Sequence, residues 1–453
     1  NGNNTTPTGK TFTSQWSVAA MALDLDNGTW EMFIDGVATG TIYSGISGTY
    51  TFAIGDSMSS GYHTHTANFG QKPFKFSPPD GFQPLNNVNT RPVNVISRPD
   101  QYVGVTTFTG NGGTQSIDVG HEPDLVWLKD RGAGEHHGLF DTIRGPLMRL
   151  TSDYNYASTS RANTVTSFNY NGVTLGSAGE YNGNNDPIVC WSWKAGGSKN
   201  TFNVDDVGYA SAAAAGLTAG DVTPTGASVG TKQGFSIIRW TAPTWNGGPQ
   251  QVPHGLTQPP SFIIAKVIND AASWYCYHKD LDSSSPEDKY ISLNDNAAAG
   301  TLANSWGTSA PNSTTFGDRQ LGWSDGKNVI SYIWHDVPGL QKFGVYEGNA
   351  EPTDGNYIHL GFRPAILIIK DIDSTGYWYI TDSERNPTND TTTSYVWANS
   401  AAAEQNDYSV DLLSDGFDLY ASSGNLNATR TYIYAAWAEA PSVDLYGGGA
   451  NAR

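Results

Sequence analysis

The chain has 453 residues and a formal net charge of -18, because 43 acidic side chains outnumber 25 basic ones. Binding a phosphate backbone needs a basic surface, so we expect no nucleic acid partner. With 51 glycines, 12% aromatic residues and 15% charged residues, the composition predicts short strands and tight turns. No apolar run is long enough to span a bilayer, and the two cysteines predict no disulfide framework.

Residues 12–86 alternate polar and apolar side chains between glycines. The pattern predicts a hairpin with strands at 18–24 and 29–34 and a turn that ends at Gly28. Motifs such as Phe33-Ile-Asp-Gly36 and Pro78-Pro-Asp-Gly-Phe82 resemble the central strands and closing segment of a SPRY-type domain. The resemblance implies that residues 1–86 form the second half of a concanavalin-like β-sandwich, a fold used mainly for binding. Because the first half is missing, we expect further chain upstream.

A linker is expected at 87–102, which has two prolines and little periodicity. Beyond it, a short apolar strand that follows a proline and ends in a lysine occurs three times. The copies cover 123–129, 260–266 and 364–370, each with a glycine shortly upstream, at Gly120, Gly255 and Gly361. One buried-strand pattern with the same flanking residues predicts an internal repeat.

Each copy belongs to a longer repeat that closes on a tryptophan, at Trp193, Trp334 and Trp437. The proline-to-tryptophan separations of 70, 74 and 73 residues predict one fold used three times. We expect the three tryptophans to pack in the core, and each lysine to mark the point where its strand leaves the core. The boundaries are repeat A at 103–197, a loosely ordered low-complexity connector at 198–233, repeat B at 234–339, repeat C at 340–441 and a C-terminal tail at 442–453.

The predicted fold class is all-β, as tandem β-sandwich modules: a partial concanavalin-like sandwich plus three related β repeats. Repeats B and C join almost directly at 337–342, so we expect them to pack on each other.

The repeats also resemble a known group of proteins. The segment 361–371, with 383–387, 413–417 and 432–439, is similar to the repeat module of marine bacteriophage tail-fibre and other virion structural proteins. The residues 449–453 are similar to the natural ending of such chains. The resemblance implies a location on the virion, with other virion proteins and a host surface glycan or envelope protein as partners. It also implies a homo-oligomer, commonly a trimer, and it brings no catalytic residues.

Signals for catalysis and for metal binding are weak. The sequence lacks Gly-x-Ser-x-Gly, His-Glu-x-x-His and a phosphate-binding glycine loop, so we expect no enzyme and no cofactor. His63 and His65 fall on one face of a strand, but a metal site needs three or four ligands, and we expect none. A plain hairpin turn accounts for Asp24 to Gly28. The segment 135–137 is expected to be an exposed polar loop tip.

Tryptophans in polar loops are the best candidates for a binding site. They are Trp245, Trp306, Trp323 and Trp397, which lie in stretches rich in Gly, Asn, Ser and Asp and do not recur between repeats. An aromatic ring there can stack on a sugar while neighbouring polar groups bond the sugar hydroxyls. The alternative is that these rings plug the sandwich ends or an oligomer contact.

The expected function is therefore that of a bacteriophage tail fibre or surface appendage, which binds the host envelope or its glycans with avidity from several copies. One alternative is a secreted, extracellular bacterial protein that binds or cleaves glycans. Another is a purely architectural capsid or filament component.

Overall fold

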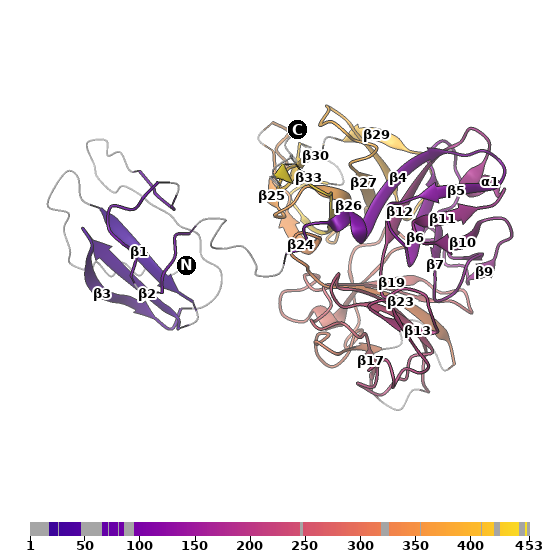
Figure 1. Ribbon diagram of the computed structural model, residues 1–453, viewed down its shortest axis with the longest axis horizontal. Coiled ribbons are helices and arrows are strands. Elements are labelled where there is room, and N and C mark those ends of the chain that lie inside the picture. The colour runs from indigo at the N-terminus through magenta and orange to yellow at the C-terminus, as the bar shows by residue number, and fades with distance from the viewer. Residues whose placement is uncertain are drawn as a thin grey trace. The chain divides into compact units, whose positions relative to one another are not determined.

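The computed structural model describes residues 18–25, 27–46, 66–70, 72–79, 81–85, 95–244, 248–318, 326–353, 355–408, 410–420, 426–443 and 449–450. The chain divides into two compact units, Asn1–Val93 and Asn94–Arg453. Both are built from strands that are mostly antiparallel, which confirms the predicted all-β fold class (Figure 1). In the described ranges no helix is long and apolar enough to cross a membrane.

Unit 1 contains the antiparallel sheet β1-β2-β3, formed by β1 (Ala19–Asp24), β2 (Thr29–Ile34) and β3 (Val37–Ser44). The first two strands confirm the predicted hairpin, and Gly28 adopts a φ of 64° in its turn. The Asp24 carboxylate accepts hydrogen bonds from the backbone and side-chain amides of Asn27, at 2.9 and 2.7 Å. This carboxylate is thus used to shape the turn. His63 and His65 lie outside the described residues.

Unit 2 contains the three repeats, and each has a core sheet with the same strand order. The opening strand pairs with the closing strand, the closing strand with the lysine strand, and the lysine strand with an aromatic strand. In repeat A these are β4 (Val103–Thr109), β12 (Pro187–Trp193), β6 (Leu125–Asp130) and β7 (Gly138–Asp141). In repeat B they are β16 (Phe235–Thr241), β23 (Asn328–Trp334), β18 (Phe262–Val267) and β19 (Trp274–His278). In repeat C they are β24 (Gln341–Glu347), β32 (Thr431–Ala438), β26 (Pro364–Asp371) and β27 (Trp378–Asp382). The shared order confirms the predicted repeat.

A second, smaller sheet covers one face of each core sheet, so every repeat is a β-sandwich. The smaller sheets are β10 (Val165–Asn169), β11 (Gly172–Leu175) and β5 (Gln115–Asp118) in A, β17 (Gln250–Pro253) and β22 (Thr315–Asp318) in B, and β25 (Ile358–His359), β31 (Gly416–Leu419) and β30 (Val410–Leu413) in C. Side chains between the two sheets form the private core of each repeat. In repeat A, for example, Val126 and Leu128 cluster with Val173 and Leu175.

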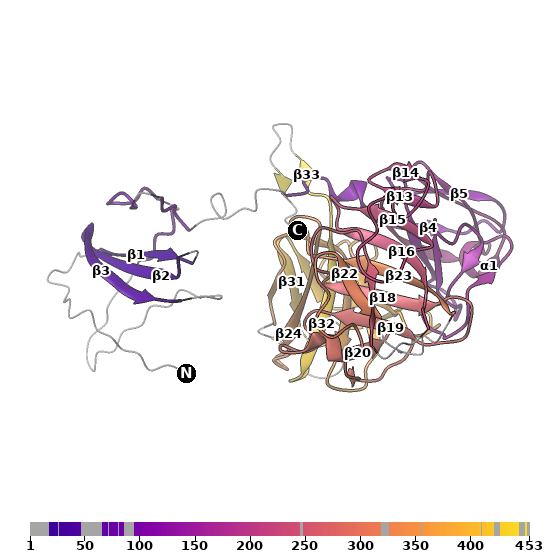
Figure 2. The ribbon, with the colours of Figure 1, turned by 90° about the horizontal axis from the view of Figure 1, so that it is seen from below.

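The opposite faces of the three core sheets meet in one shared core. At its centre lie Trp193, Trp334 and Trp437, with ring centroids 5.4 to 6.3 Å apart and planes inclined by 67 to 71°. Their predicted role in the core is confirmed. Equivalent residues of all three repeats contact one another, so the repeats form a ring around a pseudo-threefold axis within one chain. Figure 2 shows the same sheets from below.

Burial on both faces explains why the lysine strands are apolar at nearly every position. All residues of β6, β18 and β26 are buried. The upstream glycines, Gly120, Gly255 and Gly361, have φ values of 85°, 73° and 88°. Residues with a Cβ rarely adopt this left-handed conformation, so glycine is required at the turn that leads into each strand.

The ring closes in one direction, from A to B, from B to C and from C back to A. The last residue of each aromatic strand contacts the closing strand of the next repeat. Asp141 Oδ2 accepts from the Tyr332 hydroxyl at 2.7 Å, His278 Nε2 lies 3.2 Å from the Tyr434 carbonyl oxygen, and Asp382 Oδ2 accepts from Trp191 Nε1 at 2.9 Å. Arg144 and Arg385 form buried ion pairs with the two aspartates. The predicted packing of B on C is confirmed, and A also contacts both.

Residues 198–233, expected to be a loosely ordered connector, are part of the fold. They contain β13 (Phe202–Val204), β14 (Val207–Tyr209) and β15 (Gly226–Gly230), which add three strands to one edge of the core sheet of repeat B. The small residues allow close packing, since a Cβ at Gly220 would lie 2.4 Å from the carbonyl oxygen of Gln251. Composition alone does not separate such packing from disorder.

The remaining elements are short. They are the 3-10 helices Pro99–Gln101 and Pro286–Asp288, α1 (Gly179–Asn182), β8 (Met148–Arg149), β9 (Thr159–Ser160), β20 (Lys289–Ser292), β21 (Gly300–Thr301), β28 (Thr393–Trp397), β29 (Gln405–Tyr408), β33 (Ser442–Val443) and β34 (Gly449–Ala450). The first of them lies in the predicted linker, whose described part belongs to unit 2.

Candidate functional site

The strand register gives the ring two different ends. At the tryptophan end the closing strands finish beside the start of the lysine strands, as where Trp193 pairs with Leu125. The chain enters the ring there, since the Ile96 N–H donates to the Pro338 carbonyl at 3.0 Å. It also leaves there, because β32 ends at Ala438. The opposite end, where the lysine strands finish, is called the lysine end. It faces away from both connections.

Three equivalent loops, 151–158, 292–299 and 397–404, cover the lysine end. Each is tied to the next repeat through its backbone. The N–H groups of Ser158, Ala299 and Glu404 donate to the carbonyl oxygens of Ile268, Ile372 and Arg131, each at 2.9 Å. Exposed residues remain at the loop tips, among them 154–156 and 296–297. Loops held by a rigid scaffold with exposed tips are typical of binding surfaces.

The repeated lysines, Lys129, Lys266 and Lys370, are fully buried at this end. The expectation that each marks the exit of its strand from the core is therefore wrong. The Lys266 ammonium lies at a contact between repeats, 3.4 Å from the Asn155 carbonyl oxygen of repeat A, whereas Lys129 donates to the Ala133 carbonyl of its own repeat at 3.1 Å. Each ammonium also donates to the carbonyl of the following residue, at 2.5 to 2.7 Å. Burial lowers the pKa of each lysine to about 8.

A lowered pKa normally makes an amine a better nucleophile, but burial should keep these three lysines unreactive. We expect acetic anhydride at neutral pH to modify the exposed Lys199 and to leave Lys129, Lys266 and Lys370 unmodified until the protein is unfolded. Peptide mass spectrometry after brief labelling measures this. Labelling of Lys266 at the rate of Lys199 in the folded protein would show that reagents reach the amine, and would make it a candidate reactive group.

An exposed aromatic cluster lies on the loop of repeat A. Tyr154 and Tyr156 are 44% and 46% exposed, and their rings stack with centroids 4.3 Å apart and 22° between the planes. The His136 imidazole packs edge-on against both, at 5.4 and 6.4 Å. Asp153 holds this imidazole, because its Oδ2 lies 2.5 Å from His136 Nδ1 while its Oδ1 accepts from the His137 N–H at 3.2 Å. We call Tyr154, Tyr156, His136 and Asp153 the tyrosine cluster.

None of the four predicted tryptophans belongs to the tyrosine cluster, which was therefore not identified from the sequence. The segment Tyr154-Asn-Tyr156 nevertheless carries the same signal, aromatic side chains in a loop rich in Asp, Asn and Ser. The segment 135–137 was expected to be an exposed loop tip, and this is correct only in part. His136 is partly exposed whereas His137 is fully buried, because successive side chains of an extended segment point to opposite sides.

The four predicted tryptophans have different outcomes. Trp245 and Trp323 lie outside the described residues. Trp306 is fully buried in the private core of repeat B, edge-on to Tyr277 at 5.8 Å, so no face is open to a sugar and its predicted binding role is wrong. Trp397 is half-buried and stacks on Tyr377, which is 37% exposed, with centroids 4.6 Å apart. It stays a candidate.

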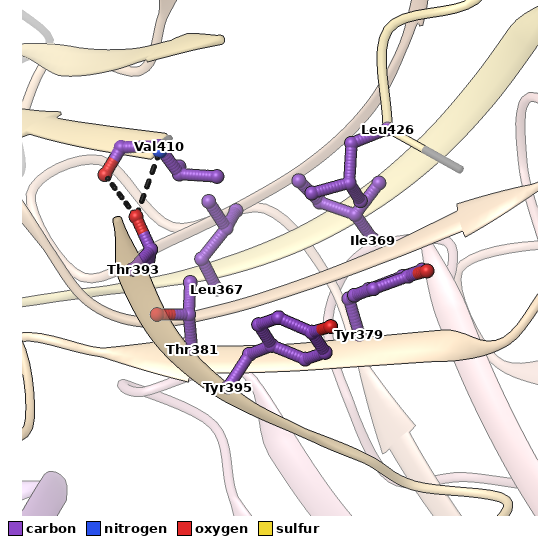
Figure 3. A pocket seen from close by; sticks show the side chains of 8 residues that line it. All are labelled: Leu367, Ile369, Tyr379, Thr381, Thr393, Tyr395, Val410 and Leu426. Carbon is purple, nitrogen blue, oxygen red and sulfur yellow. Dashed lines mark hydrogen bonds between the residues drawn. The ribbon is translucent and has the colours of Figure 1, made fainter. Parts of the chain in front are cut away.

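A small cavity lies between the two sheets of repeat C (Figure 3). Its lining residues are Leu367, Ile369, Tyr379, Thr381, Thr393, Tyr395, Val410 and Leu426. The Thr393 hydroxyl bridges the β28 and β30 strands, accepting from the Val410 N–H at 2.8 Å and donating to the Val410 carbonyl at 3.2 Å. With a volume of about 10 Å³, the cavity has room for a single water molecule and not for a ligand.

Among the residues that the structure describes, potential metal ligands and cysteines do not cluster at the loops of the lysine end. In the ranges that the structure describes, no group of three or more His, Cys, Asp or Glu side chains could hold a metal ion. Cys190 and Cys276 are buried thiols in different repeats, and neither forms a disulfide. Burial raises the pKa of Cys190 to about 12 and that of Cys276 well above its ordinary value, so neither is a nucleophile at neutral pH.

Comparison with known proteins gives one match. A family model with the description "Domain of unknown function (DUF7483)" matches residues 98–441. The match begins just before β4 and ends just after β32, so it covers the complete ring of three repeats. No curated protein and no solved structure was found to match the chain.

Proposed function

The chain belongs to this family of unknown function, and we propose that it is a virion structural protein that attaches a bacteriophage to its host. In this proposal it is a tail fibre or surface appendage on the virion, and the loops at the lysine end meet the host envelope or its glycans. It acts by binding its partner and not by turnover.

One observation carries the proposal: the tyrosine cluster lies at the end of the ring opposite to the end where the chain enters and leaves. A protein that is anchored through one end and recognises a partner through the other needs this polarity. Burial on both faces of the core sheets gives a rigid support for the loops. The likeness of 361–371 and 432–439 to virion repeat modules supports the virion setting.

The proposed partners are other virion proteins, a host surface glycan or envelope protein, and further copies of the chain in a homotrimer. The contacts between repeats are already made within one chain, for example between Tyr332 and Asp141. A homotrimer would therefore have to form through other surfaces. The net charge of -18 argues against contact with nucleic acid.

Electron microscopy of purified virions labelled with antibodies against unit 2 tests this proposal. We expect label at one fixed position on the particle surface, and we expect the purified chain to reduce phage adsorption to host cells in a dose-dependent way. Virions that lack the chain would contradict the virion role. Virions that carry it, but whose adsorption is unaffected by excess free chain, would contradict the attachment role.

A further inference from the structure

We propose that Tyr154 and Tyr156 form a stacking subsite for a neutral or N-acetylated hexose of a cell-surface oligosaccharide, with His136 as the polar group beside it. This inference rests on the proposed attachment function and names the ligand class that the lysine end takes.

The tyrosine cluster is held in place before any ligand arrives. The two phenol rings stack on each other, and the His136 ring stands nearly perpendicular to both, at 80 and 81°. The Asp153 side chain that fixes His136 is only 2% exposed. From the neighbouring repeat, Trp274 Nε1 donates to the Tyr154 carbonyl at 3.1 Å. A preorganised aromatic surface loses little conformational entropy on binding, which favours affinity.

The shape and polarity of the cluster fit a pyranose ring. One face of a hexose carries C–H groups, which pack on an aromatic face, while hydroxyl groups at the ring edge need polar partners. His136 uses Nδ1 for Asp153, and its Nε2 has no partner among the described residues.

Charge decides between classes of sugar. The whole chain is strongly acidic, Asp153 is itself part of the cluster, and Glu135 directly precedes His136 in the sequence. The cation Arg149, whose charge acts on Tyr156, lies 3.7 Å from Glu180, which also pairs with Arg161, and the buried Lys129 interacts with Asp153 and Glu135. Because these local charges nearly balance, it is the net charge of -18 on the whole chain that repels an acidic saccharide and leaves a neutral or N-acetylated one unaffected.

Saturation-transfer NMR on the full chain tests the proposal with four probes: cellotriose, mannotriose, N,N′,N″-triacetylchitotriose and trigalacturonate. We expect a signal from at least one neutral trisaccharide and none from trigalacturonate. Tyr156→Ala should weaken the neutral probe about tenfold or more, and Tyr156→Phe, which keeps the ring, should restore most of the affinity. Tyr170→Ala is the matched control, since this tyrosine is 86% exposed between β10 and β11, away from the cluster.

Both exposed tyrosines can be replaced without opening the core, so an unchanged melting temperature should accompany each variant. The proposal is overturned if no neutral trisaccharide binds, or if Tyr156→Ala binds as tightly as the parent chain. Binding of the labelled chain to host cells distinguishes failure of the proposed subsite from failure of the proposed attachment function. Cell binding that survives Tyr156→Ala would remove this subsite and leave the attachment function standing, whereas a parent chain that binds no host cell would remove the attachment function itself.

Discussion

Unit 2 is expected to unfold as the pH falls from about 7 to about 4, because three buried histidines hold it together only in their neutral form. They are His137 and His278, which connect neighbouring repeats, and His254 inside repeat B. Burial lowers the pKa of His137 and His254 to about 4 and that of His278 to about 3.

The hydrogen bonds of these rings explain why protonation is unfavourable. In each, Nε2 faces a carbonyl oxygen and therefore carries the proton, while Nδ1 accepts from an N–H group. The carbonyl oxygens belong to Trp397, Asn312 and Tyr434, at 3.0, 3.0 and 3.2 Å from His137, His254 and His278. The N–H donors are Trp127 Nε1 at 2.8 Å and the backbone of Leu256 and Asp280 at 3.1 Å. If Nδ1 also carried a proton, it would point at the N–H group that now donates to it, and this hydrogen bond would be lost.

The direction in which stability changes with pH follows from the number of protons bound by the folded and the unfolded chain. In the unfolded chain a histidine has a pKa near 6.5, so below that pH the unfolded state takes up protons that the folded state refuses. Stability is therefore complete above about pH 6.5 and is lost progressively down to about pH 4. Asp124 opposes this, because burial raises its pKa to about 6 and the folded state takes up one proton.

The unfolded chain binds three more protons on the histidines and one fewer on Asp124, so it binds about two protons more than the folded chain. The free energy of unfolding therefore falls by about 3 kcal/mol for each pH unit. Between about pH 6 and 4 the loss is about 5 kcal/mol, comparable to the total stability of a typical domain. The pKa values of His121 and His335 are also lowered by burial, and these groups add to the loss.

Urea unfolding followed by circular dichroism at four pH values from about 7 to 4 measures the effect. His278→Gln should reduce the pH dependence by about one proton. His359→Gln, at an imidazole with 63% exposure, is the surface control for the substitution itself. A constant urea midpoint across this range would contradict the prediction.

Local patterns in the sequence were sufficient for the strands but not for their assembly. The lysine strands β6, β18 and β26 could be predicted because a buried strand needs only an apolar run and a turn, and both are local features. Closure of the ring depends on contacts between distant segments, such as Trp191 with Asp382. Repeated spacing shows that the repeats are alike, and it does not show which of their faces meet.

The candidate site was only partly predictable for the same reason. Trp306 and Tyr156 both lie in loops rich in small and polar residues, yet the first is fully buried and the second is half exposed. Exposure depends on which other segment covers the loop. The lysines are a further case, because the local pattern predicts that the strand leaves the core at Lys266, whereas the loop of repeat A covers this residue.

Replacing Trp334 by alanine is expected to lower the free energy of unfolding by about 3–5 kcal/mol. The side chain is 2% exposed, stacks on Phe235 at 4.6 Å and contacts both Trp193 and Trp437. Its removal leaves a cavity lined by all three repeats, and the surrounding rings can fill it only by moving together. The loss of stability should therefore affect all three repeats, although the substitution lies in repeat B alone.

Hydrogen exchange of the backbone amides distinguishes a shared loss from a local one. In Trp334→Ala we expect protection to fall by the same free energy in β12, β23 and β32, which belong to three different repeats. Tyr170→Ala, at a fully surface-exposed position, should change the unfolding free energy by less than about 0.5 kcal/mol. If exchange accelerates in β23 but not in β12 or β32, the repeats are independent modules, and the contact of the three tryptophans is packing without energetic coupling. Equal loss in all three strands means that the ring is one folding unit, and that its loops are held by the full stability of unit 2.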